Sequence, residues 1–134
     1  MPAFVATLST HVLSDAPPYE ALSYVWGPFN SPDDPDLIQL NDCGFEVTTN
    51  LWRALYALRH ETKDRVLWID AICINQGDLE ERSSQVQLMR DVYRKARSVV
   101  VWLGEEGTWT TELFKYLKKT RSTRVRAVFS YYTL

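Results

Sequence analysis

The segment from Leu67 to Gly104 has the clearest pattern of apolar and polar stretches in the chain. An apolar run from Val66 to Ile69, extending as far as Ile74, predicts a strand buried on both faces. A polar turn and an amphipathic helix follow, and then a second apolar run at 98–103 predicts another buried strand. The apolar helix positions are spaced by three, four or seven residues: Leu79, Val86, Met89, Tyr93 and Ala96. Two strands joined by such a helix predict a parallel crossover, and therefore a sheet covered by helices.

Shorter elements are predicted in the N-terminal half of the chain. A short strand is expected within 3–8, and a longer one over 19–26, where aromatic and apolar residues dominate. Two short runs on either side of 42–44 predict a β-hairpin. Asn50 is placed to cap a helix over 51–60.

Further along the chain, the crossover helix has a recognisable start. Asp78 and Glu81, three residues apart, fit the capping-box pattern, with Asp in place of Ser or Thr. A final helix is expected over 108–119 and one more strand within 126–134. The whole pattern predicts an α/β fold with a central, mainly parallel sheet flanked by helices and a small β-hairpin insertion.

Composition narrows the class of protein. The 134 residues suit a single domain, and contents of 46% hydrophobic and 24% charged residues are ordinary for a soluble globular protein. The chain has no apolar run long enough to span a membrane, and its first residues do not resemble a signal peptide. The cysteines, Cys43 and Cys73, and the histidines, His11 and His60, have no metal-ligand spacing. A cytoplasmic protein with no metal site and no required cofactor is expected.

The charge is unevenly distributed. Residues 1–112 contain nine basic and 17 acidic side chains, a net charge of −8, whereas 113–134 contain six basic and no acidic ones. The division predicted from this is an N-terminal segment at 1–18, a domain at 19–112 and a basic tail at 113–134. A basic tail suits an acidic partner, but a solvated helix face explains it as well. The acidic body would repel a phosphate backbone, which argues against nucleic-acid binding.

The candidate ligand-binding residues lie after the predicted strands. Asp70, Asn75 and Gln76 follow one strand and Trp26 ends another, and ligands bind at the carboxyl ends of strands in open parallel sheets. Asp70 would contact a ligand there, and Trp26 would provide an aromatic wall. The alternative is structural: the polar groups build one turn, and the tryptophan covers the core.

Three blocks resemble the heterokaryon incompatibility (HET) domain of filamentous fungi. They are YEALSYVWG at 19–27, LWIDAICINQ at 67–76 and VVVWLG at 99–104. The resemblance implies a role in fungal non-self recognition, in which proteins with this domain trigger localised cell death after genetically different hyphae fuse. It also implies action through self-association or protein partners. The domain is usually joined to a larger C-terminal region, so this chain is expected to be a fragment or a short family member.

HET domains are in turn similar to Toll/interleukin-1 receptor (TIR) domains, which implies a TIR-like, flavodoxin-like sheet. Some TIR domains cleave NAD with a glutamate in a Trp-x-x-x-Glu-Leu pattern. Here Trp109 and Glu112 match that pattern with one residue fewer between them. Glu112 would stabilise the oxocarbenium-like transition state of NAD, the substrate, or would simply favour a helix N-terminus. The alternatives to a signalling module are thus an NAD-cleaving enzyme and an inactive truncated remnant.

Overall fold

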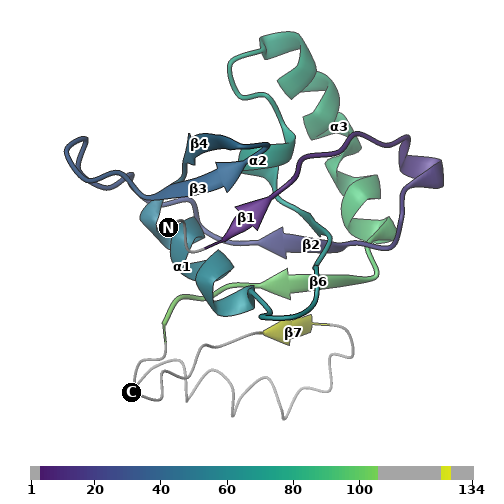
Figure 1. Cartoon of the computed structure of the whole chain (residues 1–134). Helices are drawn as coiled ribbons and strands as arrows, with labels where there is room; N and C mark the ends of the chain where they lie inside the picture. Colours follow the sequence, from purple (N-terminus) through teal and green to yellow (C-terminus); the bar gives the residue numbers. More distant parts are fainter. Residues whose placement is uncertain (1–3, 106–124, 128–134) are drawn as a thin grey trace.

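A parallel sheet forms the centre of the protein in the computed structural model, which describes residues 4–105 and 125–127 (Figure 1). The strand order is β5-β2-β6-β7, and each neighbouring pair is parallel. The bounds are Glu20–Ser23 for β2, Leu67–Trp68 for β5, Ser98–Val101 for β6 and Val125–Ala127 for β7. Counted along the chain, the spatial order is second, first, third, fourth. The connections therefore change direction between β2 and β6, where a topological switch point lies.

A second, smaller sheet has the order β1-β3-β4. Strand β1 (Val5–Ala6) is parallel to β3 (Leu37–Leu40), and β3 is antiparallel to β4 (Cys43–Glu46), so this sheet is mixed. The predicted hairpin is confirmed, but its turn comes earlier than expected. Asn41 and Asp42 form it with φ of 47° and 64°, because a two-residue hairpin turn of the primed type needs positive φ at both positions. Cys43 and Gly44 belong to β4.

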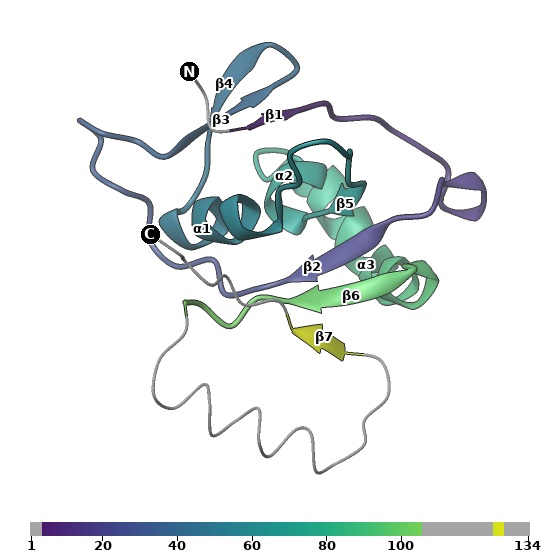
Figure 2. The same cartoon turned by 60° about the horizontal axis from the view of Figure 1, so that its bottom comes forward.

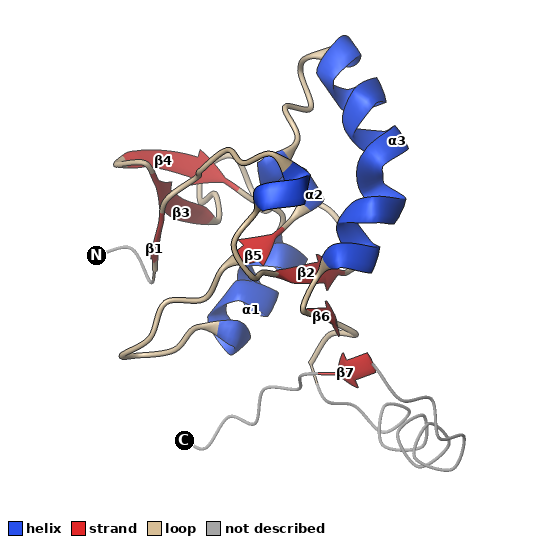
Figure 3. Cartoon of the chain, turned by 90° about the vertical axis from the view of Figure 1, so that its right-hand side faces the viewer, coloured by secondary structure: helices blue, strands red, loops and turns tan. Residues whose placement is uncertain are grey.

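Helices cover both faces of the parallel sheet, which confirms the predicted α/β layering. Helix α1 (Thr49–Leu58) and helix α3 (Leu79–Lys95) lie on opposite sides of it in Figure 3. The short helices are η1 (Leu13–Asp15) and α2 (Asp70–Cys73). Ala21 and Leu22 of β2 are both 0% exposed. Because neighbouring residues of a strand point to opposite faces, both faces are buried.

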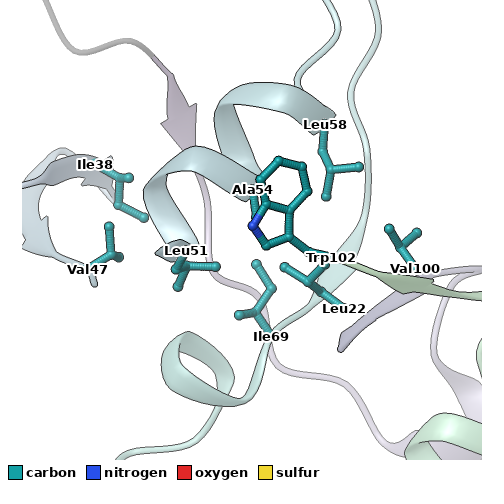
Figure 4. Packing of buried hydrophobic residues seen from close by; sticks show 9 residues of the cluster. All are labelled: Leu22, Ile38, Val47, Leu51, Ala54, Leu58, Ile69, Val100 and Trp102. Atoms are coloured by element: carbon teal, nitrogen blue, oxygen red, sulfur yellow. The ribbon is translucent and has the colours of Figure 1, made fainter. Parts of the chain in front are cut away.

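The main hydrophobic core lies between the parallel sheet, α1 and the hairpin (Figure 4). Helix α1 contributes three side chains spaced by three and four residues, which places them on one face. The nine members are Leu22, Ile38, Val47, Leu51, Ala54, Leu58, Ile69, Val100 and Trp102. Ile38 and Val47 come from the hairpin region, so this core joins the two sheets.

The predicted extension of the first crossover strand to Ile74 is wrong. Strand pairing ends at Trp68, and the backbone then turns into α2, where the N–H of Cys73 donates to the carbonyl oxygen of Ile69. A continuous apolar run does not distinguish a strand from a short helical turn against the core, because apolar side chains suit both. Strand β5 is also at the edge of this sheet, with β2 as its neighbour. Backbone hydrogen bonds from one side only are therefore available to lengthen it.

The predicted strand at 19–26 is shorter than expected, since β2 covers Glu20–Ser23. The predicted cap of α1 is also displaced. Thr48 is the N-cap, its side chain accepting a hydrogen bond from the Leu51 N–H, and Asn50 lies inside the first turn. Asn50 is therefore free to bind elsewhere.

The capping prediction for α3 is confirmed at Asp78, whose carboxylate accepts hydrogen bonds from the N–H groups of Glu80 and Glu81. The Glu81 carboxylate does not reciprocate to Asp78, as a full capping box would require. It accepts from the N–H of Asn75 instead, at 3.2 Å. The helix start is therefore tied back to the turn that precedes it.

The predicted buried face of α3 is only partly correct. Met89, Tyr93 and Ala96 are half-buried, but Leu79 and Val86 are 72% and 53% exposed. Val92 is the buried residue of this helix. The N-terminal half of α3 projects beyond the rest of the described domain (Figures 1 and 3), so its apolar positions lack the cover that their spacing predicts.

Candidate functional site

Side chains from three strand ends meet along the carboxyl edge of the parallel sheet. Trp26 follows β2, and its indole Nε1 donates a hydrogen bond of 3.0 Å to the Asp70 Oδ2 at the end of β5. The chain leaves β2 through Gly27, which has a φ of +68°. This left-handed conformation suits glycine, which has no Cβ to oppose it. Two of the predicted site residues, far apart in sequence, are therefore brought into contact.

The Asp70 carboxylate has a second partner. Its Oδ1 accepts a hydrogen bond of 2.8 Å from the N–H of Ala71. The side-chain Nε2 of Gln76 donates to the Asp70 carbonyl oxygen at 3.0 Å, while the Asn75 Oδ1 accepts from the N–H of Gly77. These contacts join the beginning and the end of the turn between β5 and α3. They favour the structural interpretation of Asp70, Asn75 and Gln76, and their binding of a ligand stays a prediction.

Asn50 was not among the predicted site residues, yet it occupies the switch point between β2 and β6. Its Nδ2 donates to the carbonyl oxygen of Val25, and its Oδ1 accepts a 2.9 Å hydrogen bond from the Trp102 Nε1. One amide side chain therefore links the segments that leave the two strands. The sequence signal for Asn50 was a polar amide in an otherwise apolar helix pattern. A role as the helix N-cap explained that amide equally well, so the sequence did not indicate a site residue.

Phenol and thiol groups surround Asp70. Burial raises the pKa of Tyr24, and the nearby Asp70 carboxylate raises it further. The Tyr24 hydroxyl oxygen is buried and has no partner in hydrogen-bond geometry within the described segments. Burial and Asp70 also raise the pKa of Tyr93, whose hydroxyl donates to the Leu22 carbonyl oxygen at 3.1 Å. Burial is the main cause that raises the pKa of Cys73, so its thiol stays protonated and unreactive.

These raised pKa values predict a loss of stability in alkaline solution. The unfolded chain releases the phenolic protons near the ordinary pKa of 10.0, whereas folded Tyr24 and Tyr93 retain theirs. The folded state then binds more protons, so the free energy of unfolding falls as the pH rises above about 10. Urea unfolding measured at a series of pH values should show this fall. Tyr24→Phe should make it shallower, and an unchanged slope in that variant would contradict the assignment.

No group of three or more His, Cys, Asp or Glu side chains in the described segments is arranged to hold a metal ion. Glu112, the predicted catalytic residue, lies outside the described residues. The predicted helix at 108–119 does too. The described part of the carboxyl edge thus contains a hydrogen-bonded carboxylate, two indoles and a buried phenol. None of the helices found in the described part is long and apolar enough to cross a membrane.

The fold is that of an α/β domain with a parallel central sheet. At its carboxyl edge, Asp70 after β5 is hydrogen-bonded to Trp26, which follows the neighbouring strand β2. The family model described as "Heterokaryon incompatibility protein (HET)" matches residues 19–131, and the chain belongs to this family. It is 43% identical over 105 residues to the Neurospora crassa protein "Heterokaryon incompatibility protein 6, OR allele". That alignment covers 71% of this chain and 15% of the relative. No solved structure matches the chain.

The three sequence blocks meet in space because β2 lies between β5 and β6 in the sheet. The first block contains β2 and Trp26, the second contains β5 and Asp70, and the third contains β6 and Trp102. Side chains of all three blocks, together with Asn50, form the bonds along the carboxyl edge. Residues of the three blocks therefore contribute, with Asn50, to the hydrogen bonds along this edge.

Proposed function

We propose that this chain is a cell-death effector domain of fungal non-self recognition, acting in the cytoplasm through self-association or protein partners. The observation that carries the proposal is the family match over residues 19–131. The name of the Neurospora crassa relative points to the same process. The chain spans only a small part of that relative, so the regions that sense non-self would belong to other segments or other proteins.

The finer fold proposed with this function is a TIR-like, flavodoxin-like sheet. The order β5-β2-β6-β7 supports it, because it reads 2-1-3-4 along the chain and the flavodoxin-like order is 2-1-3-4-5. The small mixed sheet would be an insertion between β2 and α1 extended by the N-terminal strand.

Induced expression of the chain in a filamentous fungus tests the proposed function. We expect hyphal compartments that express the wild-type chain to die, as counted by vital-dye uptake. Leu22→Asp, which buries a charge at a position with 0% exposure, should unfold the domain and abolish killing. Leu88→Ser, at an exposed position, is the matched control that should kill like the wild type. Survival of compartments that accumulate folded wild-type protein would contradict the proposal.

NAD cleavage is the competing function, and it depends on Glu112 in the Trp109–Leu113 segment. The purified chain at high concentration would then release nicotinamide from NAD, and Glu112→Ala would abolish the release. Under our proposal no release is expected. Turnover that disappears in the variant would replace the signalling function with an enzymatic one.

A further inference from the structure

The N-terminal strand β1 lies at the edge of the small sheet and is two residues long. It consists of Val5–Ala6, and within the described segments it pairs only with β3. The carbonyl oxygen of Ala6 accepts a hydrogen bond of 3.1 Å from the Asn41 N–H. The N–H of Leu8 donates to the Asn41 Oδ1 at 2.9 Å. Because β3 is also paired with β4, β1 can leave β3 without breaking the rest of this sheet.

The two faces of this N-terminal segment differ. The Phe4 ring lies 5.7 Å from the ring of Trp52 on α1, and both residues pack against the main core. Val5, the next residue, is 66% exposed. Successive residues of a strand point to opposite faces, so one aromatic side chain anchors the segment and its neighbour faces solvent. The edge of β3 therefore fits an extended segment that carries an aromatic side chain directed toward α1.

The connection between β1 and β2 has the features of a hinge. It comprises residues 7–19 and runs along the outside of the domain, with η1 at its outermost point in Figure 2. A 2.9 Å hydrogen bond from the Asp15 N–H to the Val12 carbonyl oxygen closes η1, and none of the η1 residues is buried. The backbone on either side is already extended, with φ and ψ of −70° and 130° at Val12 and −68° and 142° at Ala16. Opening this one turn lengthens the connection, whose thirteen residues reach up to about 40 Å when extended.

We propose that β1 exchanges between two copies of this chain, so that residues 4–8 of each copy lie on β3 of the other. The structure shows which segment the β3 edge binds, and every second copy carries that segment. The exchanged strand makes the same contacts as it does within one chain, namely the hydrogen bonds with Asn41 and the ring contact between Phe4 and Trp52. The conformational change is confined to the hinge around η1. Because the exchange is reciprocal, it closes about a two-fold axis and leaves neither β3 edge open.

The exchange is expected only at high concentration of the chain. The contacts of β1 are the same in the closed and the exchanged forms, so their strength does not favour either form. The tether of 7–19 holds β1 near its own β3 at an effective concentration on the order of 1 mM. A second copy therefore competes when the chain itself approaches that concentration, as it does when copies are clustered. This inference rests on the proposed action through self-association, and it specifies the segment that acts.

Cross-linking between two variants of the full chain tests the exchange. Val5 and Gln39 are directly opposite in the parallel register, so cysteines at these positions can form a disulfide across the strands. One chain carries Val5→Cys and the other Gln39→Cys, and both carry Cys43→Ser because Cys43 is an exposed free cysteine. Neither chain can close this disulfide within itself. After brief oxidation of the mixed chains at about 1 mM, mass spectrometry should find the disulfide between the two introduced cysteines, and at about 10 µM its yield should fall about tenfold or more.

Leu37→Cys in place of Gln39→Cys is the matched control. Leu37 is 47% exposed and lies two residues earlier on β3, on the same face but out of register with Val5. If β1 lies on the second copy as it does on its own β3, Leu37→Cys should cross-link about tenfold less than Gln39→Cys. Equal yields at the two positions, or no disulfide at either, would overturn the inference.

A disulfide within one chain gives the converse test. A chain with both Val5→Cys and Gln39→Cys in the Cys43→Ser background, oxidised at about 10 µM, has its β1 fixed on its own β3. Sedimentation equilibrium at about 1 mM should then find only monomers, whereas the reduced chain should form dimers as the wild type does. Dimers of the oxidised chain would contradict the exchange. Killing of hyphae by a wild-type chain that does not exchange would refute this inference alone, whereas exchange without killing would refute the proposed function alone.

Discussion

Trp102→Ala is expected to lower the free energy of unfolding by about 3–5 kcal/mol. Trp102 is 3% exposed and belongs to the core between α1 and the parallel sheet. Its removal leaves a cavity beside Leu22 and Ala54 and deprives the Asn50 Oδ1 of its donor (Figure 4). Urea unfolding followed by far-UV circular dichroism measures the loss. Circular dichroism is preferred because the substitution removes a fluorophore.

Two variants separate the packing of Trp102 from its hydrogen bond. Trp102→Phe retains much of the aromatic volume and removes the Nε1 donor, so we expect a smaller loss of about 1–3 kcal/mol. Trp26→Ala is the control of the same residue type. Trp26 is 39% exposed, and its truncation should destabilise less than that of Trp102. Equal losses for the two alanine variants would show that the core is not centred on α1 and Trp102.

Asp70→Ala is expected to lower the free energy of unfolding by about 2–4 kcal/mol, because hydrogen bonds to a charged group contribute about 1.5–3 kcal/mol each and this residue makes two. The lost bonds are those from the Ala71 N–H and the Trp26 Nε1. Asp70→Asn retains a single acceptor oxygen and should lie between the wild type and the alanine variant. Urea unfolding at neutral pH measures all three proteins.

A matched control for this substitution is Asp78→Ala. Like Asp70, Asp78 accepts two hydrogen bonds at a helix start, but both of its donors are backbone N–H groups and the residue is exposed. We expect a loss of about 1 kcal/mol there, as for an ordinary N-cap. If Asp70→Ala were as stable as the wild type but no longer killed hyphae, the Asp70 carboxylate would serve a ligand or partner. That result would reverse the structural interpretation of the turn.

The α/β class was predictable from the sequence because the crossover between β5 and β6 has a strong periodic pattern. The predictions that were wrong concerned local features for which two alternative structures have similar sequence patterns. An apolar run such as the one containing Ile69, Ile72 and Ile74 is compatible with a strand or with a helical turn. Because β5 lies at the edge of the sheet, the chain forms the helical turn α2 there. At the start of α1, Thr48 and Asn50 are both residue types that cap helices well. The side chain of Asn50 is hydrogen-bonded to Val25 and Trp102 instead, and Thr48 is the N-cap.

The candidate site was predictable in part. Position after a strand correctly placed Asp70 and Trp26 on one edge, because parallel strands end on the same side. The contact between them was not predictable, since it depends on β2 and β5 being neighbours in the sheet. The pairing of Trp102 with Asn50 likewise joins residues 52 positions apart, and neither residue type signals it alone.

The most direct test of the account is killing by Glu112→Ala in hyphae, compared with the wild type at equal protein levels. If the chain acts as an associating effector, as we propose, the variant should kill as efficiently as the wild type. If Glu112→Ala folds normally and no longer kills, the effector acts through catalysis instead. That result would contradict the central claim.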